Sequence, residues 1–139
     1  MVRDATEADG AALADLLTQL GYPSTPEQAV RRLGRILADG AWATLLWEEG
    51  GRVLGFGGIQ LCASYEHDTP VAKLVALVVD GSVRRRGVGA DLVAALQQRA
   101  ASMGAKKIVV NSALHRADAH AFYEKLGYAR TGLRFGKEL

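Results

Sequence analysis

Apolar residues recur at helical spacing in two segments near the start of the chain. The first predicted helix begins after a cap formed by Thr6 and Asp9, and it ends at Gly21. The second begins at Thr25, with Pro26 at the first helical position. The apolar faces of the two helices consist of Ala11, Leu13, Leu16, Leu17 and Leu20, and of Val30, Leu33, Ile36 and Leu37.

The hydrophobic period changes to that of β-strands after the second helix. Segments Ala41–Glu48 and Arg52–Cys62 flank Gly50-Gly51, which is a two-residue hairpin signal. Val71–Val79 is a further strand, and its near-continuous apolar character from Leu74 predicts burial on both faces. The other expected elements are a strand at Met1–Asp4, a helix at Val88–Met103, a strand at Lys107–Asn111, a helix at Ala117–Leu126 and a last strand or hairpin at Tyr128–Phe135.

This order of elements predicts an α+β fold (mixed α/β), with one sheet and helices on both of its faces. The 139 residues correspond to a single domain over residues 1–139, and 49% hydrophobic with 23% charged residues is typical of a globular protein. No apolar run is long enough to span a bilayer, and the N-terminus lacks an apolar signal region, so we expect a cytoplasmic protein without membrane contact. Cys62 is the only cysteine, so no disulfide framework forms within the chain, and no metal is expected.

Positive charge is concentrated in one segment, although the net charge of the whole chain is only +2. Residues 84–116 carry seven Lys or Arg and one Asp, whereas residues 1–83 carry six Lys or Arg and eleven Asp or Glu. A polyanionic partner therefore has to be considered at the basic segment. Its bases are interrupted by an apolar helix rather than interleaved with aromatic residues, so we do not expect a nucleic acid.

The basic segment begins where a buried strand runs through a glycine-containing loop into a helix. Helix N-termini present free backbone N–H groups and a partial positive charge, which bind phosphates. Gly87 and Gly89 allow the backbone to approach a ligand closely. The Gly-Lys-Ser/Thr of a P-loop is absent, and a dinucleotide fingerprint would need a third glycine where Leu92 stands. The alternative is a loop whose arginines are merely solvated.

Two blocks of sequence resemble the GCN5-related N-acetyltransferase (GNAT) family. The first is similar to the family's Arg/Gln-x-x-Gly-x-Gly/Ala signature, and it reads Arg84-Arg85-Arg86-Gly87-Val88-Gly89. The second is similar to its Ala-x-x-Phe-Tyr-x-Lys-x-Gly-Phe/Tyr segment, and it reads Ala119-His120-Ala121-Phe122-Tyr123-Glu124-Lys125-Leu126-Gly127-Tyr128. The blocks have the family's order and spacing, and the resemblance covers essentially the whole chain.

The resemblance implies a mostly antiparallel sheet that is splayed in its middle and holds acetyl-CoA as cosubstrate. The strand Leu74–Val79 would carry a bulge, and backbone N–H groups of Arg85 to Ala90 would hold the pyrophosphate. An amine would attack the acetyl carbonyl directly, and Tyr123 would protonate the leaving thiolate. The cofactor-binding residues implied are Leu77, Val78, Val79, Arg84, Arg85, Arg86, Gly87, Val88, Gly89, Ala90, Asn111, Arg116, Ala119 and Phe122.

This chain departs from the family pattern at two positions. Many relatives carry Glu where Ala76 stands, so the residue that deprotonates the amine is unassigned. The candidate for this base is His67 in the polar loop Ser64–Thr69, although a solvated histidine is an equal alternative. A common Asn is replaced by Arg116, which would contact either a phosphate or an anionic substrate, or would lie on the surface.

Two stretches near the end of the chain read His115-Arg116-Ala117-Asp118-Ala119-His120-Ala121-Phe122-Tyr123 and Leu133-Arg134-Phe135-Gly136-Lys137-Glu138-Leu139. They resemble the ending of aminoalkylphosphonate N-acetyltransferases and of some small-amine acetyltransferases. Their substrate is a primary amine, and the substrate-binding candidates here are Glu66, Asp68, Asp118 and His120. We therefore expect an acetyl-CoA-dependent N-acetyltransferase for a small-molecule amine, with homodimers formed through the C-terminal strands as in relatives. The alternatives are a protein or aminoglycoside N-acetyltransferase, and a non-catalytic CoA-binding sensor or partner module.

Overall fold

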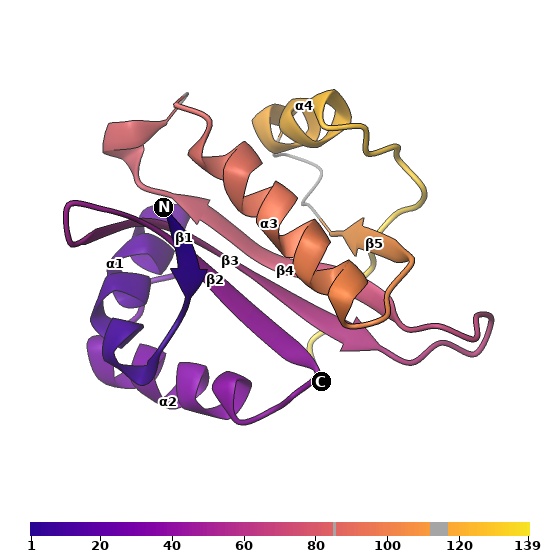
Figure 1. Ribbon diagram of the computed structural model, residues 1–139, viewed down its shortest axis with the longest axis horizontal. Coiled ribbons are helices and arrows are strands. Elements are labelled where there is room, and N and C mark those ends of the chain that lie inside the picture. The colour runs from indigo at the N-terminus through magenta and orange to yellow at the C-terminus, as the bar shows by residue number, and fades with distance from the viewer. Residues whose placement is uncertain (85, 112–116) are drawn as a thin grey trace. The chain divides into compact units, whose positions relative to one another are not determined.

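The computed structural model describes residues 1–84, 86–111 and 117–139, and they form two compact units, Met1–Val109 and Val110–Leu139. Figure 1 traces the elements of both units. No helix in these ranges combines the length and the apolar character that crossing a membrane requires. In chain order the elements are β1 (Val2–Asp4), the short 3-10 helix η1 (Glu7–Asp9), α1 (Gly10–Leu20), α2 (Pro26–Leu37), β2 (Trp42–Glu49), β3 (Arg52–Cys62), β4 (Val71–Val79), the short 3-10 helix η2 (Gly81–Val83), α3 (Val88–Ser102), β5 (Lys107–Val110) and α4 (Ala117–Lys125).

The strands form one sheet in the order β1-β2-β3-β4-β5. The pairs β1/β2, β2/β3 and β3/β4 are antiparallel, so the sheet is mostly antiparallel. The β2/β3 hairpin turns at Gly50 and Gly51, which both have positive φ, as the sequence signal predicted. The mixed α/β fold class predicted from the sequence is therefore confirmed.

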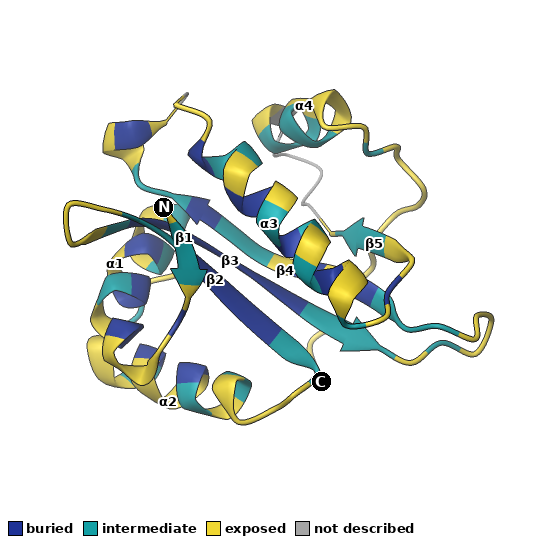
Figure 2. Cartoon of the chain, viewed as in Figure 1, coloured by how far each residue is buried: buried dark blue, intermediate teal, exposed yellow. Residues whose placement is uncertain are grey.

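Helices cover both faces of the sheet in the first unit, with α1 and α2 on one face and α3 on the other (Figure 1). The core between the sheet and α1/α2 is built from buried apolar side chains, and Figure 2 shows this burial along the strands. Its members are Ala5, Leu13, Leu16, Leu33, Leu46, Phe56 and Val78. Thr25 caps α2 through a hydrogen bond from the Gln28 amide, which confirms the predicted helix start.

Glycines in β3 allow α3 to pack very close to the sheet. A Cβ atom on Gly57 would lie 2.6 Å from Leu96 Cδ1, and one on Gly55 would lie 3.1 Å from Leu92 Cδ1. Leu92 and Leu96 are both fully buried. The absence of side chains at these two strand positions therefore fixes the distance between β3 and the helix that follows the basic loop.

The predicted last strand at Tyr128–Phe135 is wrong. Residues 128–139 contain neither helix nor strand, and nearly all of them are exposed. A strand or hairpin was expected here from the sequence, but a strand also needs a partner to accept its backbone hydrogen bonds. Among the described residues of the second unit, α4 is ended by Gly127 at φ 94°, and an exposed C-terminal segment without helix or strand follows it.

Candidate functional site

A β-bulge interrupts β4 near its middle. Gly58 pairs with Ala76 and Ile59 pairs with Leu74, so Val75 is the extra residue and its side chain is 46% exposed. Gly58 and Ile59 are consecutive in β3, so they point to opposite faces of the sheet. Residues that pair directly across two strands share a face, so Ala76 and Leu74 also face opposite sides. A bulge was expected within Leu74–Val79, and the structure places it at Val75.

The chain leaves β4 through a turn that is held by side chains from two elements. Asp80 accepts hydrogen bonds from the backbone and the hydroxyl of Ser82, at 2.9 and 2.6 Å. Gln19 of α1 donates to Asp80 at 2.9 Å and accepts from the Gly81 amide at 3.0 Å. The Ser82 and Gln19 hydrogen bonds lower the pKa of Asp80 from 3.8 to about 2, so its carboxylate is charged at neutral pH. Sequence patterns missed Gln19 because it lies 61 residues from Asp80.

Helix α3 begins without a side-chain cap. Its N-cap is Gly87, which has a left-handed φ of 81°, and the Gly87 carbonyl accepts from the Asp91 amide at 2.9 Å. The amides of Val88, Gly89 and Ala90 precede that first helical hydrogen bond, so they have no acceptor within the helix. A Cβ on Gly87 would meet no atom within 4 Å. These donors suit a phosphate group, as the strand–loop–helix pattern predicted.

One arginine of the loop is already paired with a carboxylate. Arg86 donates from both terminal nitrogens to Glu49 at the end of β2, at 3.1 and 3.2 Å, and both side chains are about half exposed. Arg84 is exposed, and Arg85 lies outside the described residues. The positive charge predicted for this loop is therefore partly neutralised by a residue from the acidic first part of the chain.

A second arginine of the basic segment is paired in the same way. Arg99 donates to both carboxylate oxygens of Asp4, at 2.8 and 3.0 Å, and this contact lowers the pKa of Asp4. A cleft of about 300 Å³ lies beside this pair, lined by residues of β1 and of the C-terminal half of α3. It is therefore at the opposite end of α3 from the uncapped amides.

The polar loop between β3 and β4 holds three of the predicted site residues. Glu66, His67 and Asp68 are exposed, and the Ser64 hydroxyl donates to Glu66 at 2.9 Å. The loop precedes the first residue of β4, Val71, which is itself about 13 Å along the strand from the bulge at Val75. The structure thus does not bring His67 to the bulge.

The predicted acid, Tyr123, lies on α4 in the second unit. It is partly buried, and its ring makes edge-on contacts with Phe122 and Tyr128 at centroid distances of 5.2 and 5.6 Å. The Tyr128 amide donates to the Tyr123 carbonyl at 3.0 Å, which closes the end of the helix. Of the other candidates in this unit, Asn111 and Asp118 are exposed, Ala119 and His120 are partly buried, and Arg116 lies outside the described residues.

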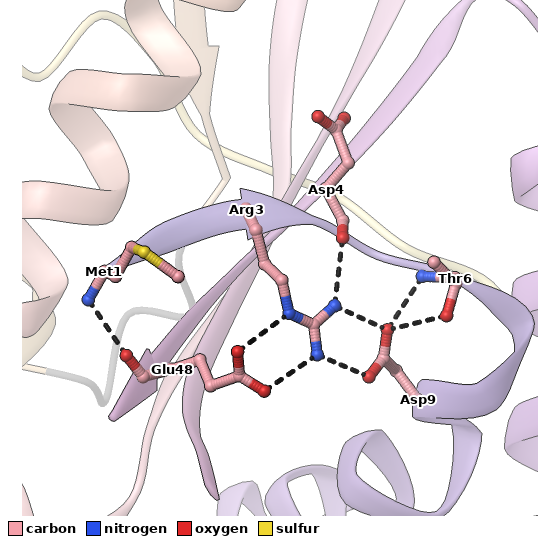
Figure 3. Close-up of polar contacts among 6 residues, drawn as sticks. All are labelled: Met1, Arg3, Asp4, Thr6, Asp9 and Glu48. Carbon is pink, nitrogen blue, oxygen red and sulfur yellow. Dashed lines mark hydrogen bonds and ion pairs between the residues drawn. The ribbon is translucent and has the colours of Figure 1, made fainter. Parts of the chain in front are cut away.

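A separate network joins β1, η1 and β2, and Figure 3 shows it. Arg3 donates to both carboxylate oxygens of Asp9, at 2.9 and 3.0 Å, and to both of Glu48 at 3.2 Å. Asp9 is only 8% exposed, and it also accepts from the Thr6 amide at 2.7 Å. The hydrogen bonds from Arg3 hold the pKa of Asp9 below its ordinary value of 3.8. This network anchors the edge of the sheet. The sequence predicted the Thr6–Asp9 cap within it, but no sequence pattern indicated the contacts of Arg3 with Asp9 and Glu48.

The comparison with known families agrees with this geometry. The model of the acetyltransferase (GNAT) family matches residues 11–128, a range that includes the bulged strand, the uncapped helix and α4. The chain belongs to the GNAT family. The resemblance identified from the sequence is thereby confirmed, and acetyl-CoA is the cosubstrate.

Two curated GNAT relatives and one solved structure illustrate the likeness. The chain is 31% identical to an aminoglycoside N(6')-acetyltransferase type 1 of Stenotrophomonas maltophilia, over 94% of this chain and 86% of that protein. It is 29% identical to an aminoalkylphosphonate N-acetyltransferase of Salmonella typhimurium, over 64% of this chain and 58% of that protein. A solved aminoglycoside N-acetyltransferase in complex with CoA superposes with a TM-score of 0.88 at 20% identity, covering 100% of this chain and 93% of that one. The chain is thus a GNAT N-acetyltransferase.

Proposed function

We propose that this GNAT enzyme transfers the acetyl group of acetyl-CoA directly to the primary amine of a small molecule. The observation that supports this most strongly is the N-terminus of α3, which follows Gly87 and has no side-chain cap. Its free backbone amides suit a phosphate, and they lie in the segment that resembles the family's Arg/Gln-x-x-Gly-x-Gly/Ala signature. Both curated relatives are named as N-acetyltransferases of small amine-bearing compounds. The single domain over residues 1–139 and the cytoplasmic location stay predictions.

The backbone of the loop and of β4 would hold the cosubstrate. Amides of Val88, Gly89 and Ala90 would bind the pyrophosphate, with the exposed Arg84 adding positive charge. Backbone groups of Leu77, Val78 and Val79, which follow the bulge, would align the pantetheine arm, and an N–H there would stabilise the developing oxyanion. Asn111, Ala119 and Phe122 complete this proposed set. Bound acetyl-CoA supplies an activated thioester.

Tyr123 would act as the general acid that protonates the departing CoA thiolate. A phenol with a pKa of about 10 remains protonated at neutral pH, as this role requires. We expect Tyr123→Phe to lower kcat by about a hundredfold, because general acids contribute roughly that much. Thiol release from acetyl-CoA measures this loss, with Tyr128→Phe as a matched control on the same unit. Unchanged turnover in Tyr123→Phe would remove Tyr123 as the acid.

The base that deprotonates the amine is tested separately. His67 was the candidate from the sequence, and it is exposed in the loop that precedes β4. A general base contributes about a hundredfold or more to the rate. If His67→Ala retains kcat, deprotonation proceeds through water instead. A hundredfold loss that recovers at higher pH would establish His67 as the base.

We propose that the positively charged acceptor binds near three acidic side chains and one histidine. Glu66 and Asp68 lie in the loop before β4, and Asp118 and His120 lie on α4. An amine panel that includes an aminoglycoside, an aminoalkylphosphonate and a lysine peptide identifies the class through thiol release. Turnover of the lysine peptide alone would favour protein acetylation over our proposal.

Ala76, which replaces a glutamate common in relatives, supports one other candidate function. A CoA-binding sensor or partner module would bind the cosubstrate without transferring its acetyl group. Calorimetry with CoA, together with the amine panel, separates the two functions. Binding without any acetylated product would favour the sensor.

We also propose that two copies pair through the C-terminal segment. Leu133 and Phe135 are 70% and 89% exposed, so two large apolar side chains of the C-terminal segment lie in solvent. A second copy would cover these side chains. Sedimentation analysis of the wild type and of Phe135→Ser measures the association state. A monomeric wild type would contradict the pairing.

A further inference from the structure

Glu49 and Arg86 form an ion pair across 37 residues of sequence, at the entrance to the loop that precedes α3. Glu49 ends β2, and Arg86 immediately precedes Gly87, the N-cap of the uncapped helix. The contact is bidentate, with both terminal nitrogens of the guanidinium directed at the carboxylate. It raises the pKa of Arg86 and lowers that of Glu49, so both groups are charged at neutral pH.

In this pair, Glu49 accepts hydrogen bonds from Nη1 and Nη2 of Arg86, which are donors that could also bind a phosphate. An arginine fork binds a carboxylate or a phosphate in the same planar, two-contact geometry. Glu49 occupies the Nη1 and Nη2 donors of Arg86, so a phosphate that binds through this same edge of the guanidinium has to displace the carboxylate. The side chains are 52% and 50% exposed, and exposed pairs of this kind cost little to open. An exchange of partners at Arg86 is thus energetically accessible.

We propose that Glu49 is a competing counter-ion that weakens the binding of the CoA phosphates to Arg86 and so sets the affinity for the cosubstrate. The inference rests on the proposed function. Glu49 holds Arg86 when the loop is free, and a phosphate displaces it when the cosubstrate binds. Its return to Arg86 assists release of CoA. Glu49 is therefore a positioning residue that acts through Arg86.

The test is a double-mutant cycle that measures the Kd for CoA by calorimetry. Glu49→Gln keeps the shape of the side chain and removes its charge, so we expect CoA to bind about two- to fivefold more tightly, the range of an exposed ion pair. Arg86→Gln should weaken binding severalfold because it removes a phosphate contact. In the Arg86→Gln background, Glu49→Gln should bring no further gain. Glu7→Gln, an exposed acid of η1, makes the same change in net charge and serves as the control.

Kinetics separate this role from a structural one. The KM for acetyl-CoA should fall in Glu49→Gln by the same factor as the Kd, without a change in the unfolding midpoint. Equal or weaker CoA binding by Glu49→Gln would overturn the inference, and so would a gain that persists without Arg86. A wild type that binds no CoA at all would overturn the proposed function itself, and with it this inference.

Discussion

Two neighbouring glutamates at the end of β2, Glu48 and Glu49, each form an ion pair with an arginine. The two pairs have the same chemistry, but they differ in how far their side chains are exposed to solvent. Glu48 joins Arg3, whose fork also holds the buried Asp9 and whose Nη1 donates to the Asp4 carbonyl (Figure 3). Glu49 joins Arg86, and these two side chains are half exposed. Because consecutive strand residues point to opposite faces, Glu48 reaches the edge network and Glu49 reaches the loop that precedes α3.

The difference shows that burial determines how easily the two partners of an ion pair can separate. A pair whose partners are buried is costly to break, because each remaining charge loses its hydrogen bonds in a poorly solvated place. A solvent-exposed ion pair can exchange partners, because water forms hydrogen bonds with each charged group when the pair separates. The Arg3 network is therefore a fixed brace between β1, η1 and β2, whereas the Arg86 pair can open to admit a ligand.

The largest expected effect comes from removing Arg3, the centre of the partly buried network around Asp9. Arg3→Ala leaves Asp9 and Glu48 without their shared partner, and we expect the free energy of unfolding to fall by about 2 kcal/mol. Urea denaturation measures this loss. Arg86→Ala is the matched control, and its unfolding midpoint should stay at the wild-type value. Equal destabilisation of both variants would contradict the contrast between the two pairs.

The pH dependence of the free energy of unfolding tests the contribution of Asp9 to the Arg3 network. The Arg3 hydrogen bonds lower the folded-state pKa of Asp9 below 3.8, so its stabilising contribution is present above about pH 4 and is lost as the pH falls further. Asp9→Asn should therefore cost about 1 kcal/mol at neutral pH, and the cost should shrink in acid. Urea denaturation of both proteins across this pH range tests the sign. A difference that grows as the pH falls would show that the charge of Asp9 is not what stabilises the fold.

The smallest of these effects concerns the turn after β4. Gln19→Ala removes both hydrogen bonds between α1 and the Asp80–Gly81 turn. Because the turn leads into the loop proposed to bind the CoA phosphates, we expect the KM for acetyl-CoA to rise by about threefold with kcat unchanged, which corresponds to one modest hydrogen bond. Gln98→Ala, on the exposed side of α3, is the control. A fall in kcat without a change in KM would place Gln19 in a different role.

Local patterns predicted the elements of this fold well. The bounds of β3 and β4 match the sequence prediction residue for residue, because Gly50-Gly51 marks the hairpin and the flanking runs favour strands. The start of α2 followed from Thr25 and Pro26, whose capping preferences are local. The expected strand at Tyr128–Phe135 failed because local residue preferences do not show whether a neighbouring strand is present to accept its hydrogen bonds.

Contacts between distant segments were not predictable from these patterns. The Arg84–Gly89 motif indicated the phosphate loop, but not that Glu49 would hold Arg86 or that Gln19 would hold the turn before it. Periodicity describes one element at a time, whereas these contacts depend on how β2 and α1 lie in three dimensions. Burial on both faces of β4 was also only partly right, because the bulge turns Val75 outward.

Acetyl-CoA labelled in its acetyl group tests the central claim most directly. The protein is incubated with the labelled cosubstrate, first alone and then with a reactive amine from the panel, and the label is followed in protein and product. Direct transfer predicts that label reaches the amine and that none remains on the protein when the amine is absent. Label retained on the protein, or label that reaches no amine, would contradict direct N-acetyl transfer.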